Sequence, residues 1–203
     1  MSLDVKYKSI ICLNGELNQI PYSYLPIIAA DGAYNKLIAK NIIPKLVVGD
    51  FDSIKNMDYS LTEFIKHADQ NLCDFEKCIL QVQKLNLGPS LIVGGFGLEP
   101  DHCFNNLTLL AKYSKSLSMT FYAHNSWTKF ITTTFQFSGE VASKVSIMPF
   151  PEALVSSSGL KWELNRHKLS ITNNTSARNE ILNGEVRIEI LEGSALIISE
   201  SEI

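Results

Sequence analysis

Short apolar runs alternate with helix-like segments over residues 1–124. Five runs have the length of strands buried on both faces: Ser9–Leu13, Ile27–Ala30, Leu46–Val48, Ser90–Val93 and Met119–Tyr122. Three segments between them favour helices, with apolar residues at helical spacing: Ala33–Lys40, the stretch 74–85 and Phe104–Tyr113. Strands that alternate with such helices are typical of βαβ units, so this part of the chain predicts a mostly parallel sheet.

The pattern changes beyond residue 124. The stretch Ile131–Phe137 is β-branched and aromatic, and apolar residues alternate with charged ones through Val186–Ile190. Lys144–Met148 and Leu169–Thr172 are shorter strand candidates, and no convincing helix pattern appears. We therefore predict an α/β protein in two parts. A Rossmann-like, mostly parallel α/β/α domain covers residues 1–124, and a small all-β domain of the sandwich or barrel kind covers residues 125–203.

Composition narrows the classes of protein that are possible. The formal net charge is −3, so no basic excess favours a nucleic-acid partner. No apolar run is long enough to cross a membrane, and Met1–Lys8 lacks the apolar core of a signal peptide. The four cysteines form no metal-binding spacing and have apolar neighbours, which favours buried free thiols. We expect a soluble, cytoplasmic protein.

Two carboxylates follow the central apolar run. Asp50 and Asp52 are one residue apart, directly after Leu46–Val48 and Gly49. Open α/β sheets bind their ligands just outside the carboxyl ends of the strands. Two carboxylates in one loop repel each other unless a cation or a hydrogen-bond donor compensates them. A magnesium site is one interpretation, and a solvated acidic turn is the other.

Further acids occupy comparable positions, namely Asp31, Asp74 and Asp101. Loops at one edge of a doubly wound sheet converge, and five carboxylates there would suit Mg²⁺ ions that carry a polyphosphate. The loop Gly94–Gly97 would let phosphates approach backbone N–H groups. Each residue also has a structural interpretation: Asp74 as a helix N-cap, Asp101 as a helix-entry acid, Lys77 as a solvated charge, His102 as a structural histidine and Trp162 as a core residue.

Four motifs, in order, resemble those of the thiamine pyrophosphokinase family over about residues 28–110. The family patterns are A-D-G-G-A-N-R, V-G-D-F-D-S, D-Q-D-x-T-D-x-x-K and G-G-x-x-G-R-x-D-H. The matching segments are Ala30–Lys36, Val48–Ser53, Asp69–Lys77 and Gly94–His102, followed by Asn106-Leu107. In the second part, Ser158–Leu164 and, more weakly, Ser176–Asn179 are similar to the thiamine-binding β domain of that family.

The resemblance implies that the terminal pyrophosphate of ATP passes to the hydroxyl of thiamine, which gives thiamine diphosphate and AMP. It also implies Mg²⁺ and a homodimer whose site lies at the subunit interface. Carried over residue by residue, Asp50, Asp52, Asp74 and Asp101 form the catalytic set, and the first three bind the metal. For ATP the resemblance implies Asp31, Asn35, Gln70, Lys77, Gly94 and Gly95, and for thiamine it implies Ser158 and Trp162.

Three departures from the family pattern concern the nucleotide. Glu99 stands at the arginine of the fourth motif, Lys36 at the arginine of the first, and Cys73 at the threonine of the third. Glutamate reverses the charge, and lysine lacks the planar fork of arginine. Two other functions therefore stay open: a pyrophosphokinase for another hydroxymethyl heterocycle, and a non-catalytic protein that binds thiamine diphosphate or a nucleotide.

Overall fold

A computed structural model describes residues 6–97 and 99–203. Leu98 of the glycine-rich loop lies outside these residues, as does most of the segment 1–8, which lacks a signal-peptide pattern. Contacts within the chain define two compact units, one ending at Ala123 and the other beginning at His124.

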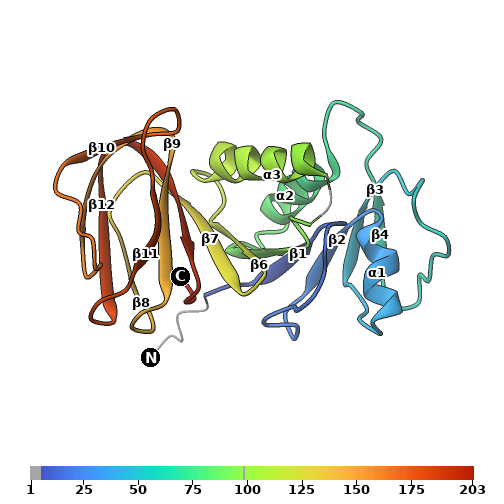
Figure 1. Ribbon diagram of the computed structural model, residues 1–203. Coiled ribbons are helices and arrows are strands. Elements are labelled where there is room, and N and C mark those ends of the chain that lie inside the picture. Colours follow the sequence, from blue (N-terminus) through green and yellow to red (C-terminus); the bar gives the residue numbers. More distant parts are fainter. Residues whose placement is uncertain (1–5, 98) are drawn as a thin grey trace. The chain divides into compact units, whose positions relative to one another are not determined.

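The described part of the first unit is built on six strands that pair in parallel with their neighbours. The strand order is β6-β5-β1-β2-β3-β4 (Figure 1). The strands are β1 (Ser9–Cys12), β2 (Ile27–Ala30), β3 (Leu46–Gly49), β4 (Glu63–Lys66), β5 (Ser90–Val93) and β6 (Met119–Ala123). Strands β1, β2, β3 and β5 are buried at every position, as their continuous apolar runs predict. The edge strand β4 is only partly buried, which explains why its sequence has no clear period.

Three helices accompany this sheet: α1 (Ala33–Ala39), α2 (Asp74–Lys84) and α3 (Pro100–Tyr113). The connection from β2 through α1 to β3 runs towards the β4 end of the strand order. The connections from β4 through α2 to β5 and from β5 through α3 to β6 run towards the β6 end. Right-handed crossovers therefore place α1 on one face and the other two on the opposite face. Figure 1 shows α2 and α3 together, apart from α1. All connections after β1, β2, β3 and β5 leave at the same edge of the sheet, so the loops predicted to converge do lie at one edge.

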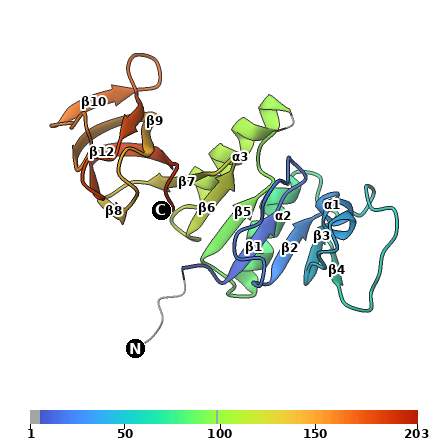
Figure 2. The same ribbon diagram turned by 60° about the horizontal axis from the view of Figure 1, so that its bottom comes forward.

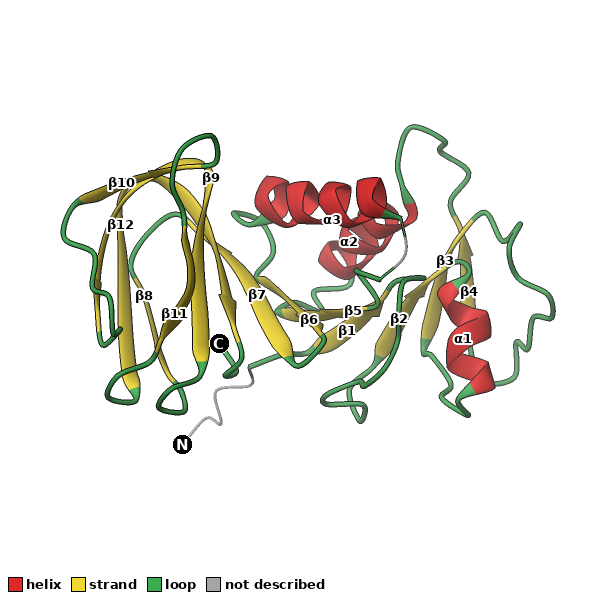
Figure 3. Cartoon of the chain, viewed as in Figure 1, coloured by secondary structure: helices red, strands yellow, loops and turns green. Residues whose placement is uncertain are grey.

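The second unit is all-β within the described residues (Figure 3). Its strands are β7 (Ser126–Ile131), β8 (Phe135–Ser138), β9 (Lys144–Ser158), β10 (His167–Ser170), β11 (Ser176–Glu180) and β12 (Glu185–Ser199). The two long strands β9 and β12 pair with each other along their length. Strands β7 and β8 pair with β12, and β10 pairs with β9 (Figure 2). Strand β11 also pairs with β9. Register shifts around Gly193 bend β12, which lets one strand contribute to two parts of the curved sheet.

Three details of the sequence prediction are wrong. The stretch Ile131–Phe137 is not one strand, because the exposed residues 132–134 form the connection between β7 and β8. Residues 127–131 pair with 195–199 of β12 and residues 135–138 pair with 185–188 of the same strand, so the chain leaves the sheet between them despite the β-propensity of threonine. The cysteines are all free, but only Cys12 and Cys78 are buried; Cys73 is exposed and Cys103 partly so. Helix α3 begins at Pro100, so Asp101 and His102 lie inside it.

None of the helices in the described ranges combines the length and the apolar composition that crossing a membrane requires.

Candidate active site

One cavity of about 560 Å³ lies in the first unit at the carboxyl ends of the strands. The loops that follow β1, β2, β3 and β5 form its walls together with the beginnings of α2 and α3. Eight of the residues that the family resemblance implies for the site line it: Asp31, Asp50, Asp52, Gln70, Asp74, Lys77, Gly94 and Gly95. The sheet thus brings together residues that are up to 64 positions apart in the chain, from Asp31 to Gly95.

Three carboxylates of this cavity form a cluster. One oxygen each of Asp31, Asp50 and Asp52 lies within 4.8 Å of the others. Asp31 is only 3% exposed, and its Oδ1 is buried without a hydrogen-bond partner. Burial, the largest cause, and the negative charges of Asp74 and Asp52 together raise the pKa of Asp31 to about 6, although a hydrogen bond from Ser53 acts in the opposite direction. A buried carboxylate oxygen without a donor, beside two more carboxylates, matches the demand of a hard divalent cation.

Asp50 and Asp52 are held by the turn between them. Phe51 adopts a left-handed conformation with φ of 72°, and its ring packs edge-on against Phe64. Asp50 accepts a hydrogen bond from Gln70 Nε2 at 3.2 Å and a longer one of 3.4 Å from the backbone N–H of Asp52. These donors lower the pKa of Asp50, so its carboxylate is charged at neutral pH.

Asp74 and Lys77 form an ion pair on the first turn of α2. Lys77 Nζ lies 3.0 Å from Asp74 Oδ1, and the lysine side chain is only 4% exposed. Burial by itself would lower the pKa of Lys77, but the hydrogen bond and the charge of Asp74, together with Asp50 and Asp31, raise it. The interpretation of Lys77 as a solvated charge is therefore wrong. The N-cap interpretation of Asp74 is also wrong, because Cys73 occupies the N-cap position and Asp74 is the first helical residue.

The glycines bring the backbone of two loops into contact. Gly15 donates from its N–H to the carbonyl of Gly94 at 2.7 Å, and a Cβ on Gly15 would lie only 2.3 Å from that oxygen. Gly94 itself has φ of +68°. The sequence did not single out Asn14 and Gly15, although these residues follow a buried parallel strand as the acidic residues do. That shared position was the signal that could have placed them in the site.

Two polar residues of the first motif support the walls from outside the cavity. Asn35 donates from Nδ2 to the carbonyl of Ser53 at 2.8 Å, which holds the loop after β3. Lys36 donates from Nζ to the carbonyl of Gly15 at 2.8 Å and also to that of Asn14. Neither residue lines the cavity. The replacement of the family arginine by Lys36 therefore concerns a backbone contact.

The end of α3 that faces the cavity differs from the prediction. Glu99 and His102 line the cavity, whereas Asp101 is exposed and is not part of its wall. Asp101 Oδ1 accepts a hydrogen bond from the backbone N–H of His102 at 2.9 Å, and side-chain ligand atoms of the three residues lie within 4.8 Å of one another.

Three lysines of the first unit, Lys36, Lys77 and Lys112, have partners other than Glu99. Lys36 binds backbone carbonyls, and Lys77 is paired with Asp74. Lys112 is paired with the buried Glu76, 2.5 Å away. Among the described lining residues, Lys77 is therefore the lysine that carries positive charge into a largely acidic cavity.

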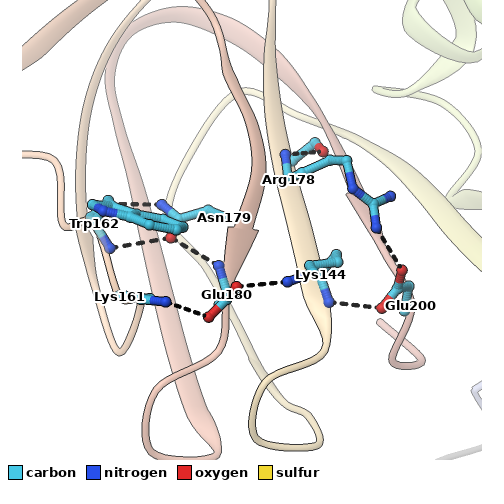
Figure 4. A network of polar contacts seen from close by, with 8 residues as sticks. Lys144, Lys161, Trp162, Arg178, Asn179, Glu180 and Glu200 are labelled. Carbon is cyan, nitrogen blue, oxygen red and sulfur yellow. Dashed lines mark hydrogen bonds and ion pairs between the residues drawn. The ribbon is translucent and has the colours of Figure 1, made fainter.

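The residues implied for thiamine lie in the second unit. Ser158 ends β9, and Trp162 follows in the connection to β10. Trp162 is 55% exposed, so its interpretation as a core residue is wrong. Its backbone forms two hydrogen bonds with the side chain of the buried Asn179 (Figure 4). The sequence indicated the segment Ser176–Asn179 only weakly. The contact joins the β9–β10 connection to β11, and the two segments meet only when the strands have paired.

Comparisons with known proteins agree on one family. The family model for the thiamin pyrophosphokinase catalytic domain matches residues 18–122, and that for the thiamin pyrophosphokinase vitamin B1 binding domain matches residues 132–194.

Individual relatives give the same result. Thiamin pyrophosphokinase 1 of Caenorhabditis elegans is 26% identical over 189 residues, which cover 85% of this chain and 77% of the relative. Thiamine pyrophosphokinase 1 of Arabidopsis thaliana is 24% identical over 199 residues, covering 88% and 73%. The crystal structure of thiamine pyrophosphokinase from Bacillus subtilis has the same fold, with a TM-score of 0.81 at 20% identity over 96% of this chain and 99% of that one. The chain therefore belongs to the thiamin pyrophosphokinase family, whose members form thiamine diphosphate by pyrophosphate transfer from ATP, generally with a divalent metal.

Proposed function

We propose that the acidic cavity of the first unit binds ATP with Mg²⁺ and that the chain transfers the terminal pyrophosphoryl group of ATP to the hydroxyl of thiamine. The observation that carries this proposal is the cluster of Asp31, Asp50 and Asp52 beside the buried ammonium of Lys77. Transfer of a phosphoryl-type group needs a metal, positioning and positive charge more than covalent help from the protein.

The donors available in the cavity fit a magnesium ion. Asp50 and Asp52 offer carboxylate oxygens on an exposed loop, and Asp31 adds a buried oxygen that has no other partner. Asp74, the third ligand that the family pattern implies, still has its Oδ2 available although Oδ1 binds Lys77. Mg²⁺ favours one or two carboxylates together with phosphate oxygens, and when bound it neutralises charge on the polyphosphate.

The other residues of the cavity would bind and orient ATP. Lys77 is kept protonated by Asp74, and its Nζ can donate to a phosphate oxygen. Gln70 holds Asp50 in place, while Gly94 and Gly95 line the cavity, where their backbone N–H groups would bind phosphate oxygens. Asn35 contributes indirectly through the loop after β3.

The second substrate would be bound by the second unit. We assign the thiamine rings to Trp162 and Ser158, and the attacking hydroxyl to a position where Asp101 can orient or deprotonate it. In this assignment residues 1–124 form the ATP-binding catalytic domain and residues 125–203 the thiamine-binding domain. The family pattern supports a homodimer in which each site takes ATP from one chain and thiamine from the other. Four free cysteines suit the reducing cytoplasm.

The test is AMP formation from ATP and Mg²⁺, with thiamine added or withheld. We expect AMP and thiamine diphosphate in equal amounts, only when thiamine is present. Asp50→Asn should lower the rate by at least about 100-fold and leave the melting temperature within a few degrees, because it removes a metal ligand from a loop. Asp58→Asn is the matched control: Asp58 lies in the same β3–β4 connection, outside the cavity, bonded to Ser60.

Near-normal turnover by Asp50→Asn would remove the metal assignment. AMP release with other alcohols but not with thiamine would instead show a different acceptor.

A further inference from the structure

Trp162 is an exposed aromatic side chain on a rigid backbone. Asn179, 2% exposed, accepts at Oδ1 from the N–H of Trp162 at 3.1 Å and donates from Nδ2 to its carbonyl at 2.7 Å. The N–H of Lys161 is bound to the carbonyl of Glu180, 2.8 Å away. Both sides of the Trp162 peptide are therefore fixed while more than half of the residue stays exposed. A preorganised aromatic surface of this kind is suited to stacking on a flat ligand.

One face of the indole already carries a cation. Lys161 Nζ lies 4.7 Å from the centre of the Trp162 ring. The same ammonium is 2.9 Å from Glu180 Oε2, and the other oxygen of Glu180 is 2.6 Å from Lys144 Nζ. Figure 4 shows Lys161 and Glu180 on one side of the indole, which is seen nearly edge-on. Since Glu180 is shared by two lysines, this group of three side chains keeps a net charge of +1.

We infer that Lys161 is a specificity-determining residue of the thiamine site: it covers one face of Trp162 and makes the opposite face favour the neutral aminopyrimidine ring of thiamine over the cationic thiazolium ring. The inference rests on the proposed function, because it assumes that thiamine binds at Trp162. An exposed tryptophan by itself would also attract a flat cationic ring, and the position of Lys161 argues against that partner.

The physical reason is competition for one π-system. A cation over an indole is attracted by the negative charge of the ring face, and this attraction is worth about 0.5–1 kcal/mol at exposed sites, or about a two- to fivefold change in affinity. A second cation on the opposite face would meet a ring that Lys161 already polarises. The positive charge of Lys161 would also repel that cation. A neutral heterocycle loses little, because stacking and burial of its surface do not depend on a positive charge.

The experiment compares two fragments of the substrate on the intact chain. The probes are 4-amino-5-hydroxymethyl-2-methylpyrimidine, which is neutral, and an N-methylated 5-hydroxyethyl thiazolium, which is cationic. Binding is measured by quenching of tryptophan fluorescence, and the Trp162→Phe variant identifies the part of the signal that comes from Trp162 and not from Trp127. The variants are Lys161→Met, Lys161→Arg and, as a matched control, Lys144→Met. The control removes the other lysine that pairs with Glu180 and leaves the cation over the indole in place.

We expect the wild type to prefer the pyrimidine, and Lys161→Met to bind the thiazolium about two- to fivefold more tightly with little change for the pyrimidine. Lys161→Arg and Lys144→Met should keep the wild-type ratio of the two affinities. An unchanged ratio in Lys161→Met, or a wild type that prefers the thiazolium, would overturn the inference while leaving thiamine at Trp162. If whole thiamine does not quench Trp162 in any variant, the proposed thiamine site itself is wrong, and the inference with it.

Discussion

Lys77 Nζ lies 3.0 Å from Asp74 Oδ1 in the cavity that also holds Asp31 and Asp50, and its side chain is almost completely buried. Four neighbouring carboxylates, Asp31, Asp50, Asp52 and Asp74, thus share one buried lysine. The arrangement is unfavourable by itself but suits a cation and a polyphosphate together, since the cation compensates the acids and the ammonium compensates the phosphates.

Lys77→Met should raise the KM for ATP by at least about tenfold, because a charge-assisted hydrogen bond to phosphate is worth about 1.5–3 kcal/mol. Steady-state AMP formation at varied ATP measures this. Lys84→Met, at the exposed last turn of the same helix, is the control. Equal KM values for both variants would mean that Lys77 only stabilises the fold.

Glu99→Arg should tighten ATP binding by about three- to tenfold at low salt, because it reverses a charge on the wall of the cavity. The gain should shrink as salt rises, since exposed charges are screened. Equilibrium binding of ATP at two salt concentrations measures both effects. Glu63→Arg on β4, outside the cavity, should change little; an equal gain there would show a general charge effect.

Glu180 should make the protein sensitive to acid. The hydrogen bonds and charges of Lys144 and Lys161 lower the pKa of Glu180 to about 2 in the folded chain, against 4.5 as its ordinary value. Its stabilising effect is therefore complete above about pH 4.5 and is lost as the pH falls towards 2.

Glu180→Gln should then have a lower melting temperature than the wild type at pH 7, and the difference should shrink below about pH 4.5 and disappear only as the pH reaches about 2. Thermal unfolding at a series of pH values measures it. Glu152→Gln, whose ion pair with Lys168 spans 3.7 Å between exposed side chains, should show a much smaller difference. A difference for Glu180→Gln that does not vary with pH would contradict the ion-pair explanation.

The proposed homodimer can be tested by mixing two inactive variants. Asp50→Asn removes the metal site, and Trp162→Ala removes the aromatic surface of the thiamine site. If each site takes one unit from each chain, mixed dimers contain one intact site, and a one-to-one mixture should regain about a quarter of the wild-type activity. Subunit exchange has to be confirmed, for example by native mass spectrometry. Exchange without regained activity would place both substrates on the same chain.

The strands and the acids of the first unit were predictable, because each depends on local sequence. The continuous apolar runs specify strands β1, β2, β3 and β5 almost to the residue, and a parallel sheet brings their carboxyl ends to one edge. Strand β4 was missed, since an exposed edge strand needs no hydrophobic period. The connection at 132–134 was missed because threonines favour strands wherever pairing allows.

The sequence by itself determined which residues could carry the chemistry: the acids after the strands, the glycines of Gly94–Gly97 and Trp162. It did not decide whether Trp162 is buried or exposed. Tertiary structure alone decided how they are used. It grouped Asp31 with Asp50 and Asp52, paired Asp74 with Lys77, and moved Asp101 off the cavity wall. It also placed Lys161 on the ring of Trp162. Propensity and period depend on near neighbours, whereas a carboxylate or a ring acquires its partners only when distant segments pack together.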